Sequence, residues 1–128
     1  MRIAIVGSRN LSVTDFLRYL PDDVDEIISG GARGVDAAVR EFAMQQRIPL
    51  REFLPDYQRY GRAAPLKRNE LIVAHSDLVL AFWDGKSRGT QHVIRCCRER
   101  GVACRVHLQQ GREFVLQSEP TEKQTPPC

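Results

Sequence analysis

Short apolar runs alternate with longer amphipathic stretches along most of the 128-residue chain. Apolar runs bounded by glycine, proline or aspartate are typical of buried strands, whereas apolar residues that recur every three or four positions are typical of helices. The run at residues 77–83 has the strongest strand character. The pattern predicts strands at residues 2–6, 25–29, 50–54, 77–83 and 102–108, and helices at residues 12–20, 35–46, 67–75 and 90–100.

This alternation predicts an α/β fold with a mainly parallel five-stranded sheet and helices on both faces. Right-handed crossovers favour a Rossmann-like, doubly wound arrangement with strand order 3-2-1-4-5. In such sheets, ligands bind at the carboxyl ends of the strands where the strand order reverses. The loops that begin at Gly7, Gly30 and Asp84 are expected to meet there.

Three segments are less regular. Residues 55–66 carry two prolines, one glycine and two tyrosines, which predicts an irregular loop that could close over a ligand. Residues 111–117 alternate enough to add a small edge strand. We expect one domain over residues 1–117 and a flexible tail over residues 118–128, where the chain is polar and contains three prolines.

Composition excludes several classes of protein. The longest apolar run, Leu78–Trp83, is far shorter than the roughly 20 residues of a membrane span. The apolar block at residues 3–6 is too short for a secretory signal, so we expect a cytoplasmic protein without a membrane partner. The four cysteines have no zinc-ligand spacing, so we expect reduced thiols and no metal.

The net charge of +3 is too small to indicate a nucleic-acid-binding protein by itself. We therefore do not expect specific binding to nucleic acid. The basic residues are nevertheless grouped, in segments that can converge on one anion: Arg59, Arg62, Lys67, Arg68, Lys86 and Arg88.

Residues 29–36 read Ser-Gly-Gly-Ala-Arg-Gly-Val-Asp and lie between a predicted strand and a predicted helix. Glycines allow a ligand to approach the backbone, the start of a helix offers free N–H groups, and Arg33 adds a permanent charge. The alternative is a tight structural turn that needs glycine, with Asp36 simply favourable in the first helical turn.

Residues 84–90 read Asp-Gly-Lys-Ser-Arg-Gly-Thr and form a second cationic turn between a strand and a helix. This turn is not a P-loop, because Leu80 stands where the motif needs its first glycine. Nor does Gly7 begin a dinucleotide fingerprint, because Arg9 stands at the second glycine position. Two such turns in one crevice favour phosphate binding over purely structural turns. Trp83, Tyr57 and Tyr60 could stack on a base, or could simply cover the core.

Five motifs together resemble the SLOG superfamily, in particular its small YspA/YpsA-related branch. They are Gly-Ser-Arg at 7–9, the turn at 29–36, Tyr-Gly-Arg-Ala-Ala at 60–64, Arg-Asn at 68–69 and the turn at 84–90, and the resemblance extends from Met1 to Leu108. It implies a Rossmann-like domain that binds a nucleotide or a nucleotide-derived ligand. It also implies that the two glycine turns hold phosphate and that Arg68 and Asn69 line the same pocket.

Two more distant resemblances define the alternatives. Gly89 and Thr90 match the loop of the LOG phosphoribohydrolases, but Val93 stands where those enzymes have a catalytic glutamate. The turn at 29–36 resembles that of the DNA-processing protein DprA, but Arg40 stands at the position of its histidine. The alternatives are therefore a nucleotide N-glycoside hydrolase that uses Asp36, Asp84 or His92, and a single-stranded DNA-binding protein.

The predicted function is binding of a small nucleotide-derived ligand, ADP-ribose-like and more in the manner of a sensor than of an enzyme. No other cofactor is implied, and a homo-oligomer is left open. The predicted binding residues are Gly7, Ser8, Arg9, Gly30, Gly31, Ala32, Arg33, Gly34, Asp36, Arg68, Asn69, Trp83, Asp84, Lys86, Ser87, Arg88, Gly89 and Thr90.

Overall fold

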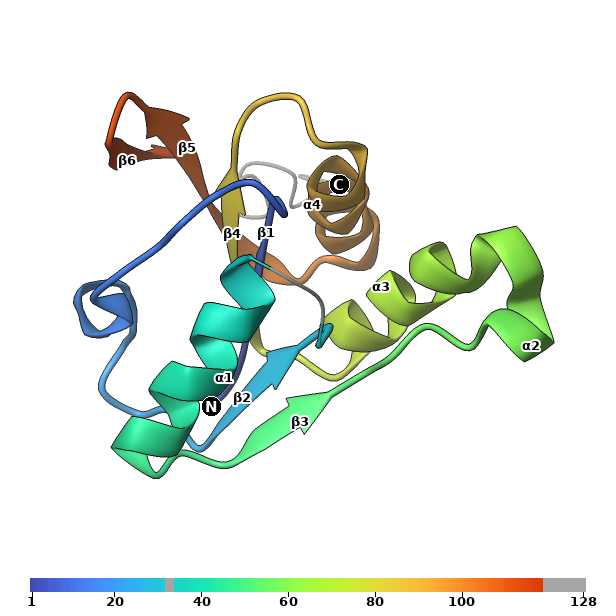
Figure 1. Cartoon of the computed structure of the whole chain (residues 1–128), viewed down its shortest axis with the longest axis horizontal. Coiled ribbons are helices and arrows are strands. Elements are labelled where there is room, and N and C mark those ends of the chain that lie inside the picture. The colour runs from blue at the N-terminus through green and yellow to red at the C-terminus, as the bar shows by residue number, and fades with distance from the viewer. Residues whose placement is uncertain (32–33, 119–128) are drawn as a thin grey trace.

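The strands form one six-stranded sheet in a computed structural model that describes residues 1–31 and 34–118 (Figure 1). Its strands are β1 (Arg2–Gly7), β2 (Glu26–Ser29), β3 (Leu50–Glu52), β4 (Leu78–Trp83), β5 (Ala103–Gln110) and β6 (Glu113–Ser118). Their order is β3-β2-β1-β4-β5-β6; the first five are parallel and β6 pairs antiparallel with β5. The predicted order of the five parallel strands is confirmed. The edge strand expected at 111–117 is β6, whose last residue is the first of the predicted tail; residues 119–128 lie outside the described part of the chain.

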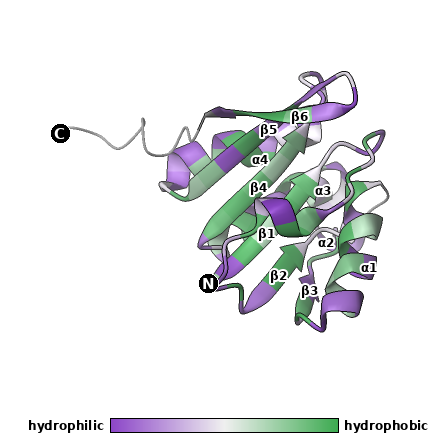
Figure 2. Cartoon of the chain, turned by 90° about the vertical axis from the view of Figure 1, so that its left-hand side faces the viewer, coloured by the Kyte–Doolittle hydropathy of each residue, from purple (hydrophilic) through white to green (hydrophobic). Residues whose placement is uncertain are grey.

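Helices cover both faces of the sheet, as predicted. One face packs against α1 (Val35–Gln46) and the 3₁₀ turn η1 (Phe16–Tyr19), and the other against α3 (Ala64–Ala74) and α4 (Arg88–Arg100). Successive side chains of a strand point to opposite faces, so in β1 Ile3 and Ile5 pack on the α1 side and Ala4 and Val6 on the α3–α4 side. Figure 2 shows the hydrophobic strand interiors between these layers. The protein therefore has a doubly wound, Rossmann-like α/β fold.

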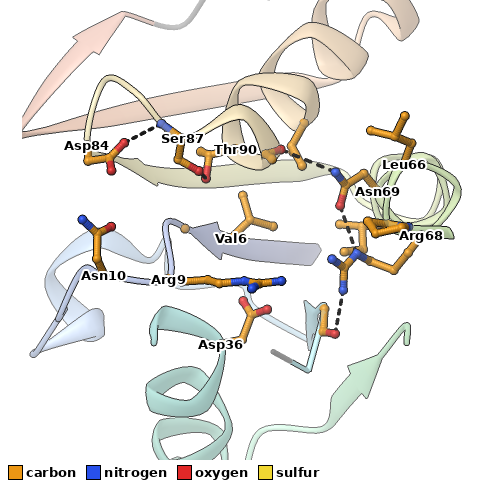
Figure 3. A pocket seen from close by; sticks show the side chains of 16 residues that line it. Val6, Arg9, Asn10, Asp36, Leu66, Arg68, Asn69, Asp84, Ser87 and Thr90 are labelled. Carbon is orange, nitrogen blue, oxygen red and sulfur yellow. Dashed lines mark hydrogen bonds between the residues drawn. The ribbon is translucent and has the colours of Figure 1, made fainter. Parts of the chain in front are cut away.

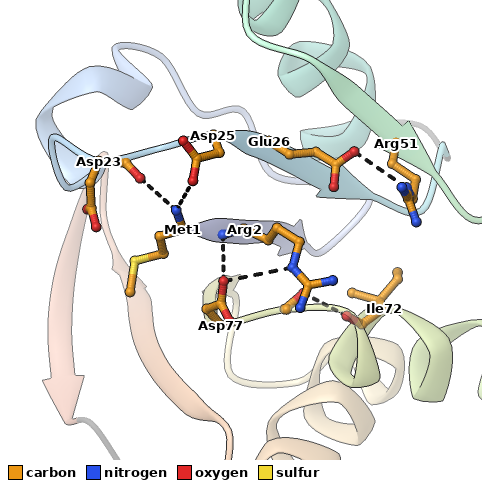
Figure 4. A network of polar contacts seen from close by, with 9 residues as sticks. Met1, Arg2, Asp23, Asp25, Glu26, Arg51, Ile72 and Asp77 are labelled. Carbon is orange, nitrogen blue, oxygen red and sulfur yellow. Dashed lines mark hydrogen bonds and ion pairs between the residues drawn. The ribbon is translucent and has the colours of Figure 1, made fainter.

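The amino ends of β1 and its neighbours are joined by polar contacts on the surface (Figure 4). The Met1 amino group donates hydrogen bonds to the Asp23 carbonyl oxygen and the Asp25 carboxylate. The Arg2 backbone N–H donates to Asp77 Oδ2 at 2.7 Å. These contacts align β1 with the segments that precede β2 and β4, at the edge of the sheet opposite the carboxyl ends of the strands.

The helix predicted over residues 12–20 is wrong, because only η1 forms within it. Leu11 and Val13 are buried while Ser12 between them is exposed, which is the alternation of an extended segment. Asp15 adopts a left-handed conformation with φ 57°, which interrupts any helix before Phe16, and Phe16 is buried. The apolar residues thus cover the sheet without forming a helix.

The irregular loop predicted over residues 55–66 is also wrong, because this segment is mostly helical. It contains α2 (Tyr57–Tyr60), the 3₁₀ turn η2 (Gly61–Ala63) and the first turn of α3. The Asp56 carboxylate accepts a hydrogen bond from the Arg59 N–H at 3.1 Å and so caps α2. Pro65 lies in the first turn of α3, where its missing N–H breaks no helical hydrogen bond.

Two further properties bear on the predictions from composition. Among residues 1–31 and 34–118, no helix combines the length and the apolar character needed to cross a membrane. The side chains of Cys96, Cys97 and Cys104 are buried in the core beside α4. Cys128 lies outside the described residues.

Candidate ligand-binding site

A cavity of about 430 Å³ lies at the carboxyl edge of the sheet, between β1 and β4 (Figure 3). Gly7 at the end of β1, Gly30 after β2 and Asp84 after β4 all line it, so the three loops that were expected to converge do so. The strand order reverses between β1 and β4, which is where ligands bind in doubly wound sheets. The fold therefore offers a preformed site at the predicted place.

Arg68, in the first half of α3, reaches across the cavity to the turn after β2. Its Nη1 donates to the Gly30 carbonyl oxygen at 2.9 Å, and its Nε donates to Asn69 Oδ1 at 3.0 Å (Figure 3). A Cβ atom on Gly30 would lie 2.6 Å from Nη1, so a side chain there would displace the guanidinium. Glycine at position 30 thus makes room for an arginine from a distant helix.

Arg9 and Asp36 complete a charged cluster with Arg68. Asp36, in the first turn of α1, is only 7% exposed, whereas Arg9 is exposed and extends across the cavity toward Arg68 (Figure 3). Burial lowers the pKa of the Arg68 guanidinium, Asp36 opposes this effect, and Arg9 adds to it by repulsion. An anion between the two arginines would relieve this repulsion, so the cluster is suited to hold one.

The turn after β4 is organised by Asp84. Its Oδ1 accepts hydrogen bonds from the backbone N–H of Ser87 at 2.7 Å and of Lys86 at 2.9 Å. These two bonds hold the pKa of the Asp84 carboxyl below its ordinary value, so the group is ionised near neutral pH. Asp84 therefore already occupies two backbone donors of a turn that the SLOG resemblance implies would hold phosphate.

An apolar wall faces the charged cluster. It is formed by the end of β1, by α3 and by the start of α4, through Val6, Pro65, Leu66, Ile72 and Val93. Val6, Ile72 and Val93 also belong to the core between the sheet and these two helices, so this wall is rigidly supported. The cavity can thus accept a flat apolar group beside an anionic one.

Asn69 lines the cavity and links α3 to the first turns of α4. It is 5% exposed, and its Nδ2 lies 3.4 Å from the Gly89 carbonyl oxygen and 3.2 Å from His92 Nδ1. His92 Nε2 lies 3.6 Å from Cys96 Sγ. Burial lowers the pKa of His92 and raises the pKa of the Cys96 thiol, so both groups are neutral and do not form a thiolate–imidazolium nucleophile.

The structure brings ten of the predicted binding residues into the cavity lining: Gly7, Arg9, Gly30, Asp36, Arg68, Asn69, Asp84, Ser87, Gly89 and Thr90. Six others lie beside it, outside its described lining: Ser8, Gly31, Gly34, Trp83, Lys86 and Arg88. The Ser8 hydroxyl accepts the Asp84 N–H at 3.4 Å, and the Trp83 indole N–H donates to the Ser87 carbonyl oxygen at 3.0 Å, so both support the turn after β4. Ala32 and Arg33 lie outside the described residues.

Sequence reasoning missed Asn10 and most of the apolar wall. Asn10 directly follows the Gly-Ser-Arg motif and could have been included on that ground. The wall has no such signal, because its residues follow the same apolar pattern as those of the core.

The three catalytic candidates differ in access to the cavity. Asp36 and Asp84 line it, whereas His92 lies behind Asn69 and outside the described lining. Val93, at the position of the LOG glutamate, contributes an apolar surface to the wall. Arg40, at the position of the DprA histidine, bonds Glu52 Oε2 at 2.9 Å and the Gly31 carbonyl oxygen at 3.4 Å, which fastens the turn after β2 to β3.

Comparison with known proteins gives one informative similarity. The chain is similar to the Gene 61 protein of Mycobacterium phage D29, with 33% identity over 82 residues. The match covers 59% of this chain and 66% of the phage protein, so the chain spans slightly less than two thirds of the length of that relative. No protein-family model matches the chain, and no solved structure matches it significantly. The name of the phage protein states no activity, so the function must be argued from the cavity itself.

Proposed function

We propose that the cavity binds a nucleotide or a nucleotide-derived ligand similar to ADP-ribose. The main support is the position of Arg9 and Arg68 at the switch point of a doubly wound sheet, opposite an apolar wall. Guanidinium groups bind phosphate through charge-assisted hydrogen bonds, and an apolar wall accepts a base. The resemblance to the SLOG superfamily predicts the same class of ligand.

The cluster suggests how such a ligand would lie. An arginine has five N–H donors, and within the described part of the chain the bonds to Gly30 and Asn69 engage two of those on Arg68. Up to three donors therefore remain for a phosphate between Arg68 and Arg9. The base would then lie against Pro65, Leu66 and Val93.

The carboxylates limit the charge of the ligand. Asp36 and Asp84 balance Arg9 and Arg68 within the described lining, and Asp84 already fills two backbone donors. The high negative charge of a triphosphate would be repelled by these carboxylates, whereas ribose hydroxyls can donate hydrogen bonds to Asp36. The balance favours a ligand with few phosphates and several hydroxyl groups.

A thermal-shift panel of AMP, ADP, ADP-ribose, NAD and cyclic nucleotides tests the proposal. A ligand at about one hundred times its Kd stabilises the fold by about 2.7 kcal/mol. For a domain of this size we expect the Tm to rise by about 10 °C. Arg9→Gln should remove most of that rise, because Arg9 is exposed and contacts the cavity. Arg98→Gln, on the exposed distal part of α4, is the matched control and should respond like the unchanged protein.

Two outcomes would contradict the proposal. One is a panel that leaves the Tm unchanged at millimolar ligand. The other is an Arg9→Gln protein that responds as strongly as the Arg98→Gln protein.

A further inference from the structure

Arg68 belongs to a continuous series of polar contacts that connects the turn after β2 to α4. The series runs from the Gly30 carbonyl oxygen to Arg68, from Arg68 Nε to Asn69 Oδ1, and from Asn69 Nδ2 to His92 Nδ1. Arg68 and Asn69 line the cavity, but His92 lies behind them. Whatever fixes Asn69 therefore also fixes the guanidinium in the cavity.

The chemistry of these groups determines which atom of His92 carries the proton. Arg68 can only donate, so the Asn69 oxygen must face it and the Asn69 NH₂ must face His92. One N–H of that NH₂ faces the Gly89 carbonyl oxygen, and the other faces His92 Nδ1. His92 Nδ1 must therefore accept, which places the proton of the neutral ring on Nε2; Cys96 Sγ lies 3.6 Å from Nε2 and 3.9 Å from Nδ1.

Protonation of His92 would disrupt this series. A protonated Nδ1 becomes a donor and opposes the Asn69 NH₂. A flip of the Asn69 amide would restore that contact, but it would turn the NH₂ toward the Arg68 guanidinium, which is also a donor. Without the flip, Asn69 loses the hydrogen bond to His92 that fixes it; with the flip, Arg68 Nε loses its hydrogen bond to Asn69 Oδ1.

The surroundings of His92 keep it neutral near pH 7. Burial lowers the pKa of His92, and Arg95 on α4 lowers it further by repulsion. Glu70 on α3 and Glu99 on α4 act in the opposite direction, and the Cys96 thiol is uncharged. Near pH 7, His92 is therefore present in the neutral form, whose Nδ1 accepts a hydrogen bond.

We infer that Asn69 and neutral His92 are positioning residues that hold Arg68 ready for an anion, so that ligand binding weakens when His92 is protonated. The inference about binding rests on the proposed function of the cavity. The coupling between His92 and Arg68 does not, and it can be measured without a ligand.

NMR spectroscopy of the full chain tests the coupling. Near pH 7, the ¹⁵N shifts of His92 should report a ring protonated at Nε2 only. As the pH is lowered, the Arg68 Nε–H signal should move with the same midpoint as the His92 ring. His75→Asn is the matched control, because His75 Nδ1 bonds the Leu71 carbonyl oxygen at the far end of α3. An Arg68 Nε–H signal that does not shift with the titration of His92, or a neutral His92 ring protonated at Nδ1, would overturn the inference.

Binding of ADP-ribose provides the second readout, because its pyrophosphate does not change charge between pH 5 and pH 7.5. Loss of a hydrogen bond to a charged group typically weakens binding by about tenfold, so we expect the Kd to rise by about that factor between pH 7.5 and a pH below the NMR midpoint of His92. His92→Asn offers an acceptor where Nδ1 stands and should bind equally well at both pH values. His92→Leu offers none and should bind weakly at both.

The two readouts separate the possible failures. If ADP-ribose and the wider panel do not bind while the Arg68 signal follows His92, the proposed function is wrong and the positioning of Arg68 stands. If ADP-ribose binds with the same pH dependence in the His92→Asn and unchanged proteins, the positioning role of His92 is wrong and the proposed function stands.

Discussion

Gly34 shares the backbone conformation of Gly61, whereas Gly30 does not, and this difference separates the roles of the three glycines. Gly34, at the start of α1, has φ 66° and ψ −120°, and Gly61, after α2, has φ 56° and ψ −129°. A Cβ on Gly34 would lie 2.3 Å from the Arg9 carbonyl oxygen, whereas a Cβ on Gly61 would meet no described residue within 4 Å. Gly30 shows no positive φ, and its Cβ would lie 2.6 Å from Arg68 Nη1 and 3.1 Å from Asp36 Oδ2, both at the ends of side chains.

These differences predict the effects of alanine substitutions. Gly61→Ala should destabilise the fold by about 1–3 kcal/mol, the usual energy of a residue other than glycine in this conformation. Gly34→Ala should destabilise it more, because the Arg9 backbone must also move. Gly30→Ala should change stability by less than about 1 kcal/mol but should remove most of the response to ADP-ribose, because it displaces Arg68. Urea unfolding and thermal shift measure the two effects; equal losses of stability in Gly34→Ala and Gly61→Ala would contradict the assignment.

At the scale of elements, the hydrophobic pattern correctly predicts helices and strands that bury one face and have ordinary length. The alternation of β1 and the helical spacing of Val35, Val39 and Ala43 are examples. The pattern did not predict the short η1, because the left-handed conformation of Asp15 cannot be inferred from the polarity of the residues. It failed again at α2 and η2, because these short turns are stabilised locally by the Asp56 cap and bury no face.

Packing between elements also predicts a pH dependence of stability, through His107 on β5. The ring stacks on Phe82 of β4 at 5.0 Å and meets the edge of Tyr19 of η1 at 4.9 Å. Only 7% of His107 is exposed, and its Nε2 has no hydrogen-bond partner within the described residues. Burial lowers the pKa of His107, and Arg105 lowers it further.

A lowered pKa means that the unfolded chain takes up this proton before the folded protein does. Stability from His107 should therefore be complete above the unfolded pKa of about 6.5 and should be lost as the pH falls from there through the folded pKa. The loss is about 1.4 kcal/mol for each unit by which the two pKa values differ. Urea unfolding at pH 7.5 and pH 5 measures it. His107→Leu should reduce the slope, and His92→Asn should reduce it only by the contribution of His92; an unchanged slope in His107→Leu would contradict this account.

At the scale of the whole molecule, the position of the site could be predicted from the strand topology, whereas the pairing of its charged groups could not. The order of the parallel strands was enough to bring Gly7, Gly30 and Asp84 to one cavity. That Asp84 would occupy the donors of its own turn depends on side-chain geometry, and so does the bond from Arg68 to Gly30. Both contacts join groups whose polarity was visible in the sequence but whose partners were not.

The charge of the whole molecule argues against single-stranded DNA as the partner. Binding to DNA depends on releasing counterions from many phosphates, and a net charge of +3 with Asp36 and Asp84 in the cavity provides little for this. We expect the Kd for a single-stranded oligonucleotide to exceed about 10 μM at physiological salt, in the range of non-specific contacts. Fluorescence anisotropy at several salt concentrations measures both the affinity and its salt dependence.

The exposed Arg59 and Arg62 near the start of α3 provide a comparison with Arg9. Weak binding that falls in Arg59→Gln and Arg62→Gln, but is unchanged in Arg9→Gln, would place DNA on the surface and leave the cavity to a small ligand. A submicromolar, salt-sensitive Kd that is lost in Arg9→Gln and abolished by ADP-ribose would instead show that DNA enters the cavity, and would replace the small-ligand proposal.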